Sequence, residues 1–350
     1  MPPKRPPAAS RRATLKDIAA AIGVSQMTVS MALRGDAQIP PKTQARVREA
    51  AAKLNYVPHE GARRLKSGKS GKIAFVAARL SHAFLGQVLS GVEQRSKETG
   101  LYPNSILPFS TWYDTAQREA ALRQILYGGL ADAVMLASMP PSAEMASAYK
   151  KHGVPLILIE DKAPLCHSVR VDNVLGAKLA TQHLLKSGCK HIGLVVGELP
   201  PKGIELNPTT VERRKGFADA MKAAGRKADP ALIASVRFFA FEEGEACLDA
   251  LLKAQPKLDG IFCAAGDRVA MGIMKRAREL KLKIPQDFKL IGYDDLQSSA
   301  LLSPALSTVH QPIELLGSVA FDLVIKALGH PELKEVDVMH QPELILRGTT

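Results

Sequence analysis

The sequence predicts a small all-α domain at the N-terminus, followed by an α/β body of two doubly wound lobes with parallel sheets. In residues 14–57, apolar residues recur at helical spacing in three short segments. From residue 72 onward, short apolar runs alternate with helical segments of about ten to fifteen residues, which is typical of βαβ units. About ten such units are too many for one small sheet, so we expect two lobes with a ligand site between the carboxyl ends of their sheets.

The basic charge of the chain is concentrated in its first 72 residues. The formal net charge is +13 over 350 residues, and residues 1–72 hold 15 Lys and Arg against four acidic residues. An asymmetry of this kind indicates an N-terminal domain that binds a polyanion, since a merely soluble basic surface would spread its charge more evenly.

The N-terminal domain has the layout of a helix-turn-helix with a third helix. The apolar stripes of the three helices are Leu15, Ile18, Ile22, Val29, Leu33, Val47, Ala51 and Leu54. Between the first two helices, Gly23 allows the positive φ of a sharp turn and Ser25 is a good N-cap. In such a motif the second helix lies in the DNA major groove. Any three-helix bundle shares this pattern, so a bundle without DNA binding is the alternative at this point.

The body is expected to contain the following elements in chain order. Strands are predicted at 73–78, 102–107, 133–138, 155–160, 191–196 and 259–264, with a last strand within 343–350. Helices are predicted at 84–99, 114–129, 142–152, 174–187, 210–224, 242–254 and 267–281. The Gly128-Gly129 pair favours a helix end at that point.

Composition argues against several other classes of protein. The four cysteines, Cys166, Cys189, Cys247 and Cys263, lack the clustered spacing of a zinc site, so we expect idle thiols, no metal and no cofactor. The first residues are basic and proline-rich, and no apolar stretch reaches the length that spans a membrane. We therefore expect a soluble cytoplasmic protein with no membrane contact, rather than an exported receptor for transport.

Enzymatic motifs are not found in the sequence. It contains no GxSxG elbow, P-loop or GxGxxG turn, and no His and carboxylate set with catalytic spacing. The stretch GKSGK at 68–72 lacks both the full phosphate-loop spacing and a preceding strand. The sequence therefore predicts that the protein is not an enzyme.

A series of motifs in one fixed order covers nearly the whole chain. They are TLKDIAAAIGVSQMTVSMALRG, LNYVPHEGARRLKSG, VRVDNVLGAKLATQHLLKSGCKHIGLV, ERRKGF, LDGIFCAAGDRVAMG, KIPQDFKLIGYDD, SPALSTVHQP and PELILRG. In these motifs the chain resembles the LacI/GalR (lactose-repressor-like) family of transcription regulators. The resemblance implies two lobes of periplasmic-binding-protein type and favours DNA binding over the bundle alternative.

The resemblance also implies a division of the chain. A disordered tail is expected at 1–13, the helix-turn-helix domain at 14–57, and a hinge helix with linker at 58–71. The effector-binding and dimerisation domain is then 72–350. Its N-lobe is expected at about 72–170 and 300–331, and its C-lobe at about 171–299 and 332–350.

The residues that match DNA-contacting positions of the family fall into three groups. Gln26 and Met27 are expected to read bases, because glutamine pairs with adenine edges and methionine offers apolar contact. Met31 occupies a position where many relatives have arginine or histidine, so no known operator sequence can be transferred. Phosphate or positioning contacts are expected from Thr14, Thr28, Ser30 and Lys42, with local capping as the alternative for Thr28 and Ser30.

The hinge residues match Arg63, Arg64 and Leu65. The resemblance implies that Leu65 wedges into the minor groove, while the two arginines face phosphates or the groove. A leucine that packs within the linker is the alternative.

A small effector is expected between the lobes. The residues that match effector-contacting positions are Phe84, Leu85, Glu160, Arg213, Phe241, Asp267 and Asp294. An arginine among carboxylates suits a polyol or an acidic sugar, and an inter-lobe salt bridge is the alternative. Gly266 replaces the asparagine usual before Asp267, and the opposite aromatic wall is either Phe239 or Phe241. Trp112 either borders the cleft or packs.

Together these features predict a homodimeric transcription regulator, most simply a repressor. It would bind a near-palindromic operator in double-stranded DNA, under the control of a carbohydrate or sugar-acid effector in the cleft. The sequence leaves open whether that effector is an inducer or a corepressor.

Overall fold

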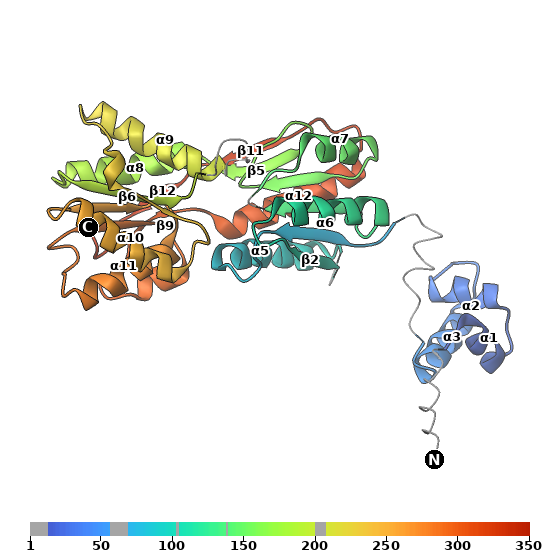
Figure 1. Ribbon diagram of the computed structural model, residues 1–350. Coiled ribbons are helices and arrows are strands. Elements are labelled where there is room, and N and C mark those ends of the chain that lie inside the picture. Colours follow the sequence, from blue (N-terminus) through green and yellow to red (C-terminus); the bar gives the residue numbers. More distant parts are fainter. Residues whose placement is uncertain (1–12, 57–68, 103–104, 138, 200–207) are drawn as a thin grey trace, which may run out of the picture. The chain divides into compact units, whose positions relative to one another are not determined.

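The computed structural model describes residues 13–56, 69–102, 105–137, 139–199 and 208–350. Contacts within the chain divide it into two compact units, residues 1–70 and 71–350, and each unit is described by itself. Figure 1 shows the helical head and the two-lobed α/β body.

The head contains three short helices, α1 (Leu15–Ile22), α2 (Gln26–Leu33) and α3 (Pro41–Lys53). The turn between α1 and α2 is as predicted: Gly23 has φ 69°, and the Ser25 hydroxyl accepts from the Thr28 N–H at the start of α2. The buried core of the head is Ile18, Ala19, Val29, Ala32, Val47, Ala50 and Ala51. Leu54 differs from its predicted core position, because it follows the last residue of α3 and is 37% exposed.

The first lobe of the body, the N-lobe, has a six-stranded parallel sheet in the order β11-β5-β4-β3-β1-β2. Its strands are β1 (Ile73–Ala77), β2 (Ile106–Ser110), β3 (Ala133–Ala137), β4 (Leu156–Ile159), β5 (His167–Val171) and β11 (Asp337–His340). Its helices are α5 (Ala83–Thr99), α6 (Thr115–Gly128), α7 (Ala143–Lys151) and α12 (Ile313–Gly329). One apolar cluster joins α5 and α12 to one face of the sheet, and another joins α6 and α7 to the opposite face. The central strands are buried on both sides, as expected of a parallel sheet.

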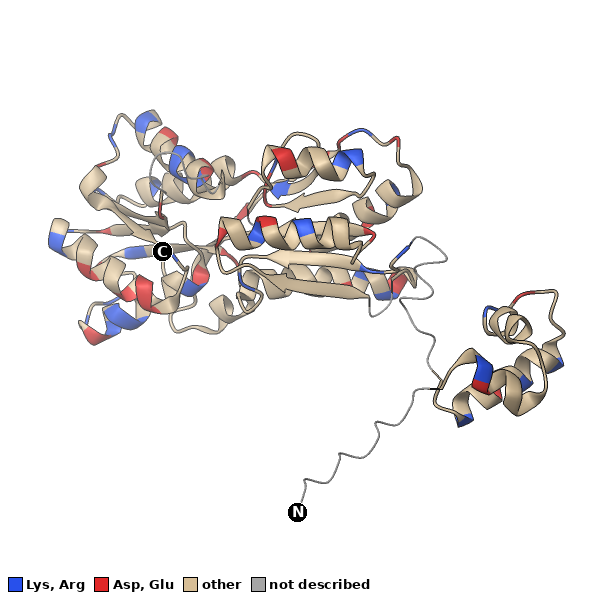
Figure 2. Ribbon diagram, turned by 45° about the vertical axis from the view of Figure 1, so that its right-hand side comes forward, with Lys and Arg blue, Asp and Glu red and all other residues tan. Residues whose placement is uncertain are grey.

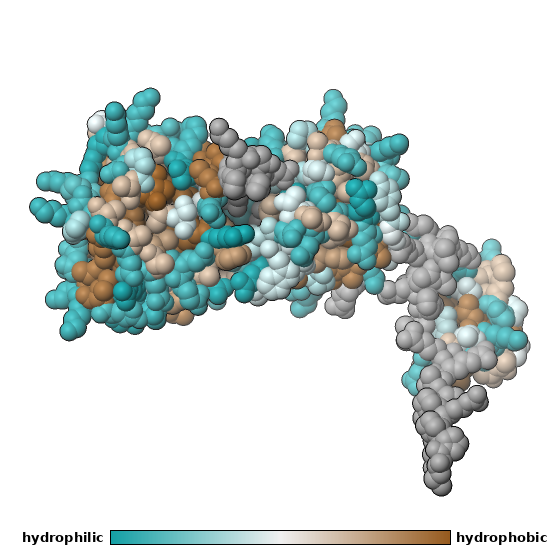
Figure 3. Space-filling view, in the orientation of Figure 1, coloured by the Kyte–Doolittle hydropathy of each residue, from teal (hydrophilic) through white to brown (hydrophobic). Residues whose placement is uncertain are grey.

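The second lobe, the C-lobe, repeats this plan in the order β12-β10-β9-β8-β6-β7. Its strands are β6 (Ile192–Gly197), β7 (Ile233–Val236), β8 (Gly260–Cys263), β9 (Lys289–Asp294), β10 (Ser307–His310) and the antiparallel β12 (Glu343–Ile345). Its helices are α8 (Asn173–Lys186), α9 (Pro208–Ala223), α10 (Phe241–Ala254) and α11 (Asp267–Glu279), with short 3₁₀ turns at Pro230–Leu232 and Gln297–Leu301. On the face of the body shown in Figure 3, hydrophilic residues dominate and hydrophobic ones form small separate patches.

The assignment of the C-terminal segments to lobes differs from the sequence expectation of 300–331 and 332–350. Strand β10 pairs with β9 and so belongs to the C-lobe, whereas β11 pairs with β5 and belongs to the N-lobe. The red segment in Figure 1 therefore passes between the lobes twice. Ladder hydrogen bonds decide these assignments, and periodicity does not reveal which sheet a short strand will join.

The second strand also lies later than its predicted range of 102–107. Strand β2 begins at Ile106 and includes Pro108. Proline is tolerated there because β2 is at the edge of its sheet, where a missing N–H breaks no central ladder.

Replacing Gly91 by alanine is expected to destabilise the body. A Cβ at Gly91 would overlap the Glu314 carbonyl, and one at Gly317 would overlap that of Val88, so the two glycines allow α5 and α12 to pack closely. Overpacking of this kind costs about 1–3 kcal/mol. The melting temperature of Gly91→Ala should therefore fall by several degrees. Gly86→Ala, on the same helix but in open space, is the matched control and should leave that temperature unchanged or raise it. Equal behaviour of the two variants would contradict the close-packing account.

Candidate functional site

Helix α2 of the head presents a polar and exposed face beside its buried one. Val29 and Ala32 are buried, whereas Gln26 is exposed and the Met27 side chain is 71% exposed. Met31 and Ser30 are half-buried on the same helix. An exposed methionine at the start of a short helix has no packing role in the head, so its apolar surface is available to a partner. Lys42 is exposed on α3, and Figure 2 shows further Lys and Arg on the helices of the head.

Two of the hydroxyls expected to contact phosphate already take part in helix caps. Thr14 is the N-cap of α1, where its N–H and its hydroxyl both donate to Asp17 Oδ2 at 2.7 Å. The Thr28 hydroxyl lies 2.9 Å from the Ser25 hydroxyl, within the cap of α2. Local capping therefore accounts for both positions, and any DNA contact would come in addition to it. Arg63, Arg64 and Leu65 lie outside the described residues.

A cavity of about 60 Å³ lies between the lobes of the body, where the carboxyl ends of the two sheets meet. Its lining consists of Ala78, His82, Phe84, Leu85, Tyr113 and Glu160 from the N-lobe, and Thr209, Arg213, Phe239, Ala265 and Asp294 from the C-lobe. Five of the seven residues predicted to contact an effector are among them. Within this lining, Arg213 contacts Glu160, and the rings of His82 and Tyr113 contact Phe239.

Arg213, on α9, is the centre of the polar side. Its side chain is held by hydrogen bonds of 2.8 Å to Asn173 Oδ1 and to the Ala264 carbonyl. The guanidinium carbon lies 3.7 Å from the centre of the Tyr293 ring. Its remaining terminal nitrogen, Nη2, is 3.7 Å from Glu160 Oε1. Arg213 is therefore rigidly placed, with one nitrogen directed toward a carboxylate at the cavity wall.

Two buried carboxyl groups, Glu160 and Asp294, line the same cavity as Arg213. Burial raises the pKa of Glu160 to about 7, against the opposing effect of Arg213. Burial also raises the pKa of Asp294 to about 7, and the charge of Glu160 adds to that shift. Asp294 Oδ1 accepts from Gln311 at 2.7 Å, whereas Glu160 Oε1 accepts from no donor among the described residues. A buried carboxylate oxygen without a donor is costly, so this cavity suits a ligand that carries hydroxyl or amine protons.

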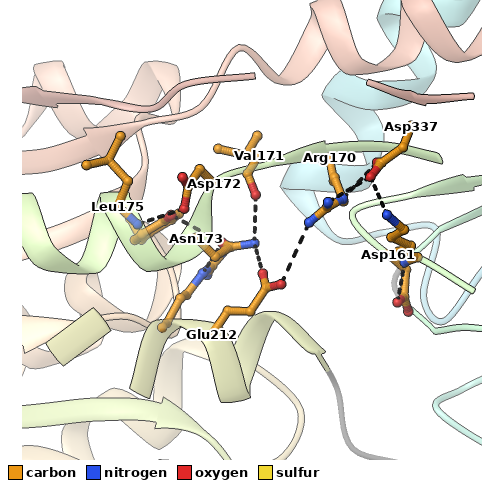
Figure 4. Close-up of polar contacts among 11 residues, drawn as sticks. Asp161, Arg170, Val171, Asp172, Asn173, Leu175, Glu212 and Asp337 are labelled. Atoms are coloured by element: carbon orange, nitrogen blue, oxygen red, sulfur yellow. Dashed lines mark hydrogen bonds and ion pairs between the residues drawn. The ribbon is translucent and has the colours of Figure 1, made fainter. Parts of the chain in front are cut away.

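A second polar network connects Arg213 to β5 and β11, the two strands after which the chain passes from the N-lobe to the C-lobe. Asn173, at the start of α8, accepts from Arg213 and donates to Glu212 Oε2 at 3.2 Å. Figure 4 shows Glu212 also facing Arg170, which makes two 2.8 Å hydrogen bonds to Asp337 on β11. Arg213 is thus linked to Arg170 on β5 through the side chains of Asn173 and Glu212.

Three aromatic or imidazole rings face each other across the cavity. Tyr113 of the N-lobe stacks on Phe239 of the C-lobe, with ring centres 6.3 Å apart and planes at 26°. His82 meets the edge of Phe239 at 6.4 Å, and burial lowers the pKa of His82 to about 4, which keeps its ring neutral at pH 7. A neutral, aromatic side of this kind suits the apolar face of a sugar ring or another flat ligand.

Two residues of the predicted site are placed elsewhere by the structure. Phe241, at the start of α10, does not line the cavity, and Phe239 provides the aromatic wall instead. Asp267 is fully buried behind the cavity, where its carboxylate accepts from the Ser299 and Thr308 hydroxyls at 2.6 Å and from the Leu296 N–H. Asp267 therefore stabilises the C-lobe, because three internal donors occupy its oxygens.

Gly266 leaves room for the Asp294 carboxylate beside the cavity. It has φ 105°, and a Cβ at this position would lie 2.8 Å from Asp294 Oδ2. A side chain before Asp267 would therefore displace the Asp294 carboxylate.

Sequence reasoning missed His82, Tyr113 and Thr209 as lining residues. Tyr113 lies three residues after the end of strand β2, and residues that follow parallel strands meet at one edge of a sheet. Because β2 ends at Ser110, later than the predicted range of 102–107, the sequence did not indicate that Tyr113 lies at this edge. Thr209 opens α9 beside Arg213, and only the fold shows that it faces the same space.

The remaining described residues show no second centre of obvious chemistry. No group of three or more metal-ligating side chains is found among them, and the four cysteines are buried free thiols. Within the same residues, no helix is both long and apolar enough to cross a membrane.

Known proteins resemble both units of the chain. The pattern described as "Bacterial regulatory proteins, lacI family" matches residues 14–59, and that of a "Periplasmic binding protein-like domain" matches residues 181–350. The ribose operon repressor of Halalkalibacterium halodurans is 30% identical over 342 residues, which cover 96% of this chain and 97% of the repressor.

Two solved structures are similar to the chain along almost its whole length. A LacI-family transcriptional regulator from Silicibacter pomeroyi has a TM-score of 0.83 at 26% identity, covering 96% of this chain and 99% of that one. The complex of the transcriptional regulator CelR with cellobiose has a TM-score of 0.70 at 25% identity, covering 97% of this chain and 100% of that one. The chain belongs to the lacI family of bacterial regulatory proteins, and it is an effector-controlled, DNA-binding transcription repressor.

Proposed function

We propose that this repressor binds a near-palindromic operator as a homodimer, and that a carbohydrate in the inter-lobe cavity controls its operator affinity. The observation that carries the effector class is Arg213, fixed by Asn173 and Ala264, in the same cavity lining as the buried carboxyl groups of Glu160 and Asp294. Planar donors beside several acceptors suit the vicinal hydroxyls of a polyol. The cellobiose complex of the similar regulator CelR supports the same class.

The charge balance of this cavity favours a neutral sugar over a sugar acid. Two carboxyl groups line it against one arginine, and three of the polar hydrogens of that arginine side chain are directed at protein partners. At neutral pH these carboxyl groups, with pKa values of about 7, together offset the charge of Arg213, so a ligand carboxylate would gain little net attraction in a site with little solvent screening. Hydroxyl protons, in contrast, would satisfy Glu160 Oε1.

In this proposal the sugar controls DNA binding because it binds different arrangements of the two lobes with different affinities. A sugar that contacts both lobes stabilises one lobe arrangement relative to others, and it shifts the operator affinity by the ratio of its affinities for those arrangements. An inducer would favour an arrangement with weak operator binding, and a corepressor would do the opposite.

The operator is read by helix α2 in this proposal. Gln26 and Met27 contact bases and Met31 extends the apolar part of that surface, while Lys42, Thr14, Thr28 and Ser30 provide positioning contacts. Two such helices in a two-fold dimer require half-sites of matching symmetry, which is why the operator is expected to be near-palindromic.

Gln26→Ala and Lys42→Ala are expected to weaken operator binding in different ways. Loss of a base contact should cost about 1–3 kcal/mol on the operator and relax the preference at one base pair. Loss of a phosphate contact should weaken binding to all sequences alike and reduce the salt slope by about 1. Fluorescence anisotropy on operator and scrambled duplexes at several salt concentrations separates the two. Identical effects of the two substitutions on both duplexes would contradict the assigned roles.

The direct experiment on the proposed function has two parts. Footprinting of the full chain on its own promoter region should reveal a protected near-palindrome. A thermal-shift screen of neutral sugars, sugar acids and nucleobases should identify the effector, because a ligand stabilises the state that it binds. The carbohydrate proposal fails if only nucleobases or only sugar acids raise the melting temperature.

A further inference from the structure

The aromatic side of the cavity continues outward onto two exposed rings. Trp112 precedes Tyr113 in the loop after β2, and Phe238 precedes Phe239 in the loop after β7. Trp112 is 62% exposed and Phe238 is 47% exposed. Tyr113 contacts one ring inside the cavity and one outside it. Its ring centre lies 6.3 Å from that of Phe239 in the cavity and 6.4 Å from that of Phe238 outside it. We call Trp112 and Phe238 the outer aromatic pair.

The backbone that presents these rings is strained. Trp112, Tyr113 and Phe239 have φ values of 53°, 61° and 53°, a region that bulky residues rarely adopt. Such conformations persist only where the surrounding structure holds them, and they gather at ligand sites. Three aromatic residues in this region, on two loops that meet at one cavity, are difficult to explain by packing alone.

Hydrogen bonds hold both loops in place. The Thr111 and Trp112 N–H groups donate to the carbonyls of Ala77 and Ala78 at the end of β1. On the other lobe, the Glu243 carboxylate accepts from the N–H groups of Arg237, Phe238 and Ala240. The backbone that carries the outer aromatic pair is therefore fixed before any ligand binds, which lowers the entropic cost of binding.

An arginine guanidinium group also lies beside each ring of the pair. The Arg79 guanidinium lies 5.7 Å from the centre of the Trp112 ring, and that of Arg237 lies 5.3 Å from the Phe238 ring. Aromatic faces with donors beside them suit a sugar ring, whose C–H face stacks while its hydroxyls hydrogen-bond. Large apolar side chains left exposed beside a binding cavity commonly mark a continuation of the site.

We infer that Trp112 and Phe238 form an outer subsite for a second sugar ring, so that the effector is an oligosaccharide of at least two rings. This inference rests on the proposed carbohydrate effector. In this inference the first ring contacts Arg213, Glu160 and Asp294 at the inner cavity, whose volume of about 60 Å³ is too small to enclose a second ring. The second ring leaves the cavity toward Trp112.

The test uses the full chain, because Trp112 is its only tryptophan and reports directly on the outer subsite. The probes are matched pairs: glucose with cellobiose and maltose, galactose with lactose, xylose with xylobiose, and mannose with mannobiose. A disaccharide that raises the melting temperature should change the tryptophan emission. By calorimetry it should also bind about tenfold tighter than its component monosaccharide, as one added stacking contact provides.

Trp112→Ala should remove that tenfold advantage and leave the affinity for the monosaccharide unchanged, while Trp112→Phe should restore most of it. Tyr127→Ala is the matched control, since Tyr127 is an equally exposed aromatic residue on α6 that does not line the cavity. The outer subsite is refuted if monosaccharides bind as tightly as disaccharides, or if Trp112→Ala leaves disaccharide binding unchanged. If no sugar of either length stabilises the chain, the carbohydrate proposal fails as well, and the two failures are thus distinguishable.

Discussion

Arg213→Ala is expected to abolish the response to the effector while leaving operator binding without effector intact. The substitution removes the planar donor of the cavity and leaves Glu160 and Asp294 without their cationic neighbour. Removing one partner from a buried charged set typically costs about 2–5 kcal/mol of binding, which corresponds to a loss of affinity on the order of 30-fold to more than 1,000-fold. The head, which reads the operator, is a separate compact unit and contains none of these groups.

Two further variants make this result specific. Arg214→Ala removes the neighbouring arginine of α9, which does not line the cavity, and it should leave effector binding unchanged. Arg213→Lys keeps a charge but loses the fixed planar donors, so it should recover only part of the affinity. Calorimetry of effector binding and circular dichroism of the folded body are the measurements. If Arg213→Ala unfolds the body and Arg213→Lys restores both folding and full affinity, the residue acts as an inter-lobe salt bridge.

The stability of the body is expected to fall as the pH rises from 6.5 to 8. Glu160 and Asp294 have ordinary pKa values of 4.5 and 3.8, and both are raised to about 7 in the folded chain by burial. A group with a raised pKa binds its proton more tightly when folded, so its contribution is fully present below the unfolded pKa and is lost as the pH passes the folded value. For a group with a folded pKa of about 7, this loss amounts to about 0.8 kcal/mol between pH 6.5 and 8.

Burial raises the pKa of Asp267 to about 7 as well, so this pH window separates the three buried carboxyl groups together from other titrations. His82, with a pKa lowered to about 4, affects stability between about pH 4 and 6.5 and with the opposite sign. Asp337, with a pKa lowered by Arg170 to about 2, affects stability only in acid. Glu160→Gln should flatten the decline of the melting temperature from pH 6.5 to 8, whereas a slope equal to that of the parent chain would contradict the raised pKa of Glu160.

Local sequence signals predicted most of the fold. Helix α1 ends at Gly23 and α2 begins after Ser25, because a positive φ and a side-chain cap are properties of single residues. The apolar runs that became β1 and β3 are buried on both faces, as a continuous run predicts. The place of β11 was not predictable in this way, since its pairing with β5 depends on a ladder between residues far apart in the sequence.

The polar half of the cavity was predictable, and the aromatic half was predictable only in part, since Phe239 was one of two alternatives and Tyr113 was missed. Arg213, Glu160 and Asp294 follow recognisable motifs, and Phe84 and Leu85 begin the helix after β1. Phe239 instead of Phe241 lines the cavity because a positive φ at Phe239 turns the chain just before α10. Asp267 matches the pattern of a cleft residue, but its three internal donors can be recognised only once the C-lobe is folded.

The account depends on one coupling, between occupation of the inter-lobe cavity and operator affinity. It is measured most directly as the operator dissociation constant of the full chain, with and without a saturating concentration of the sugar found in the screen. The account predicts a change of at least about tenfold, weaker for an inducer and tighter for a corepressor, and no change in Arg213→Ala. An operator affinity that stays the same while the sugar occupies the cavity would contradict it.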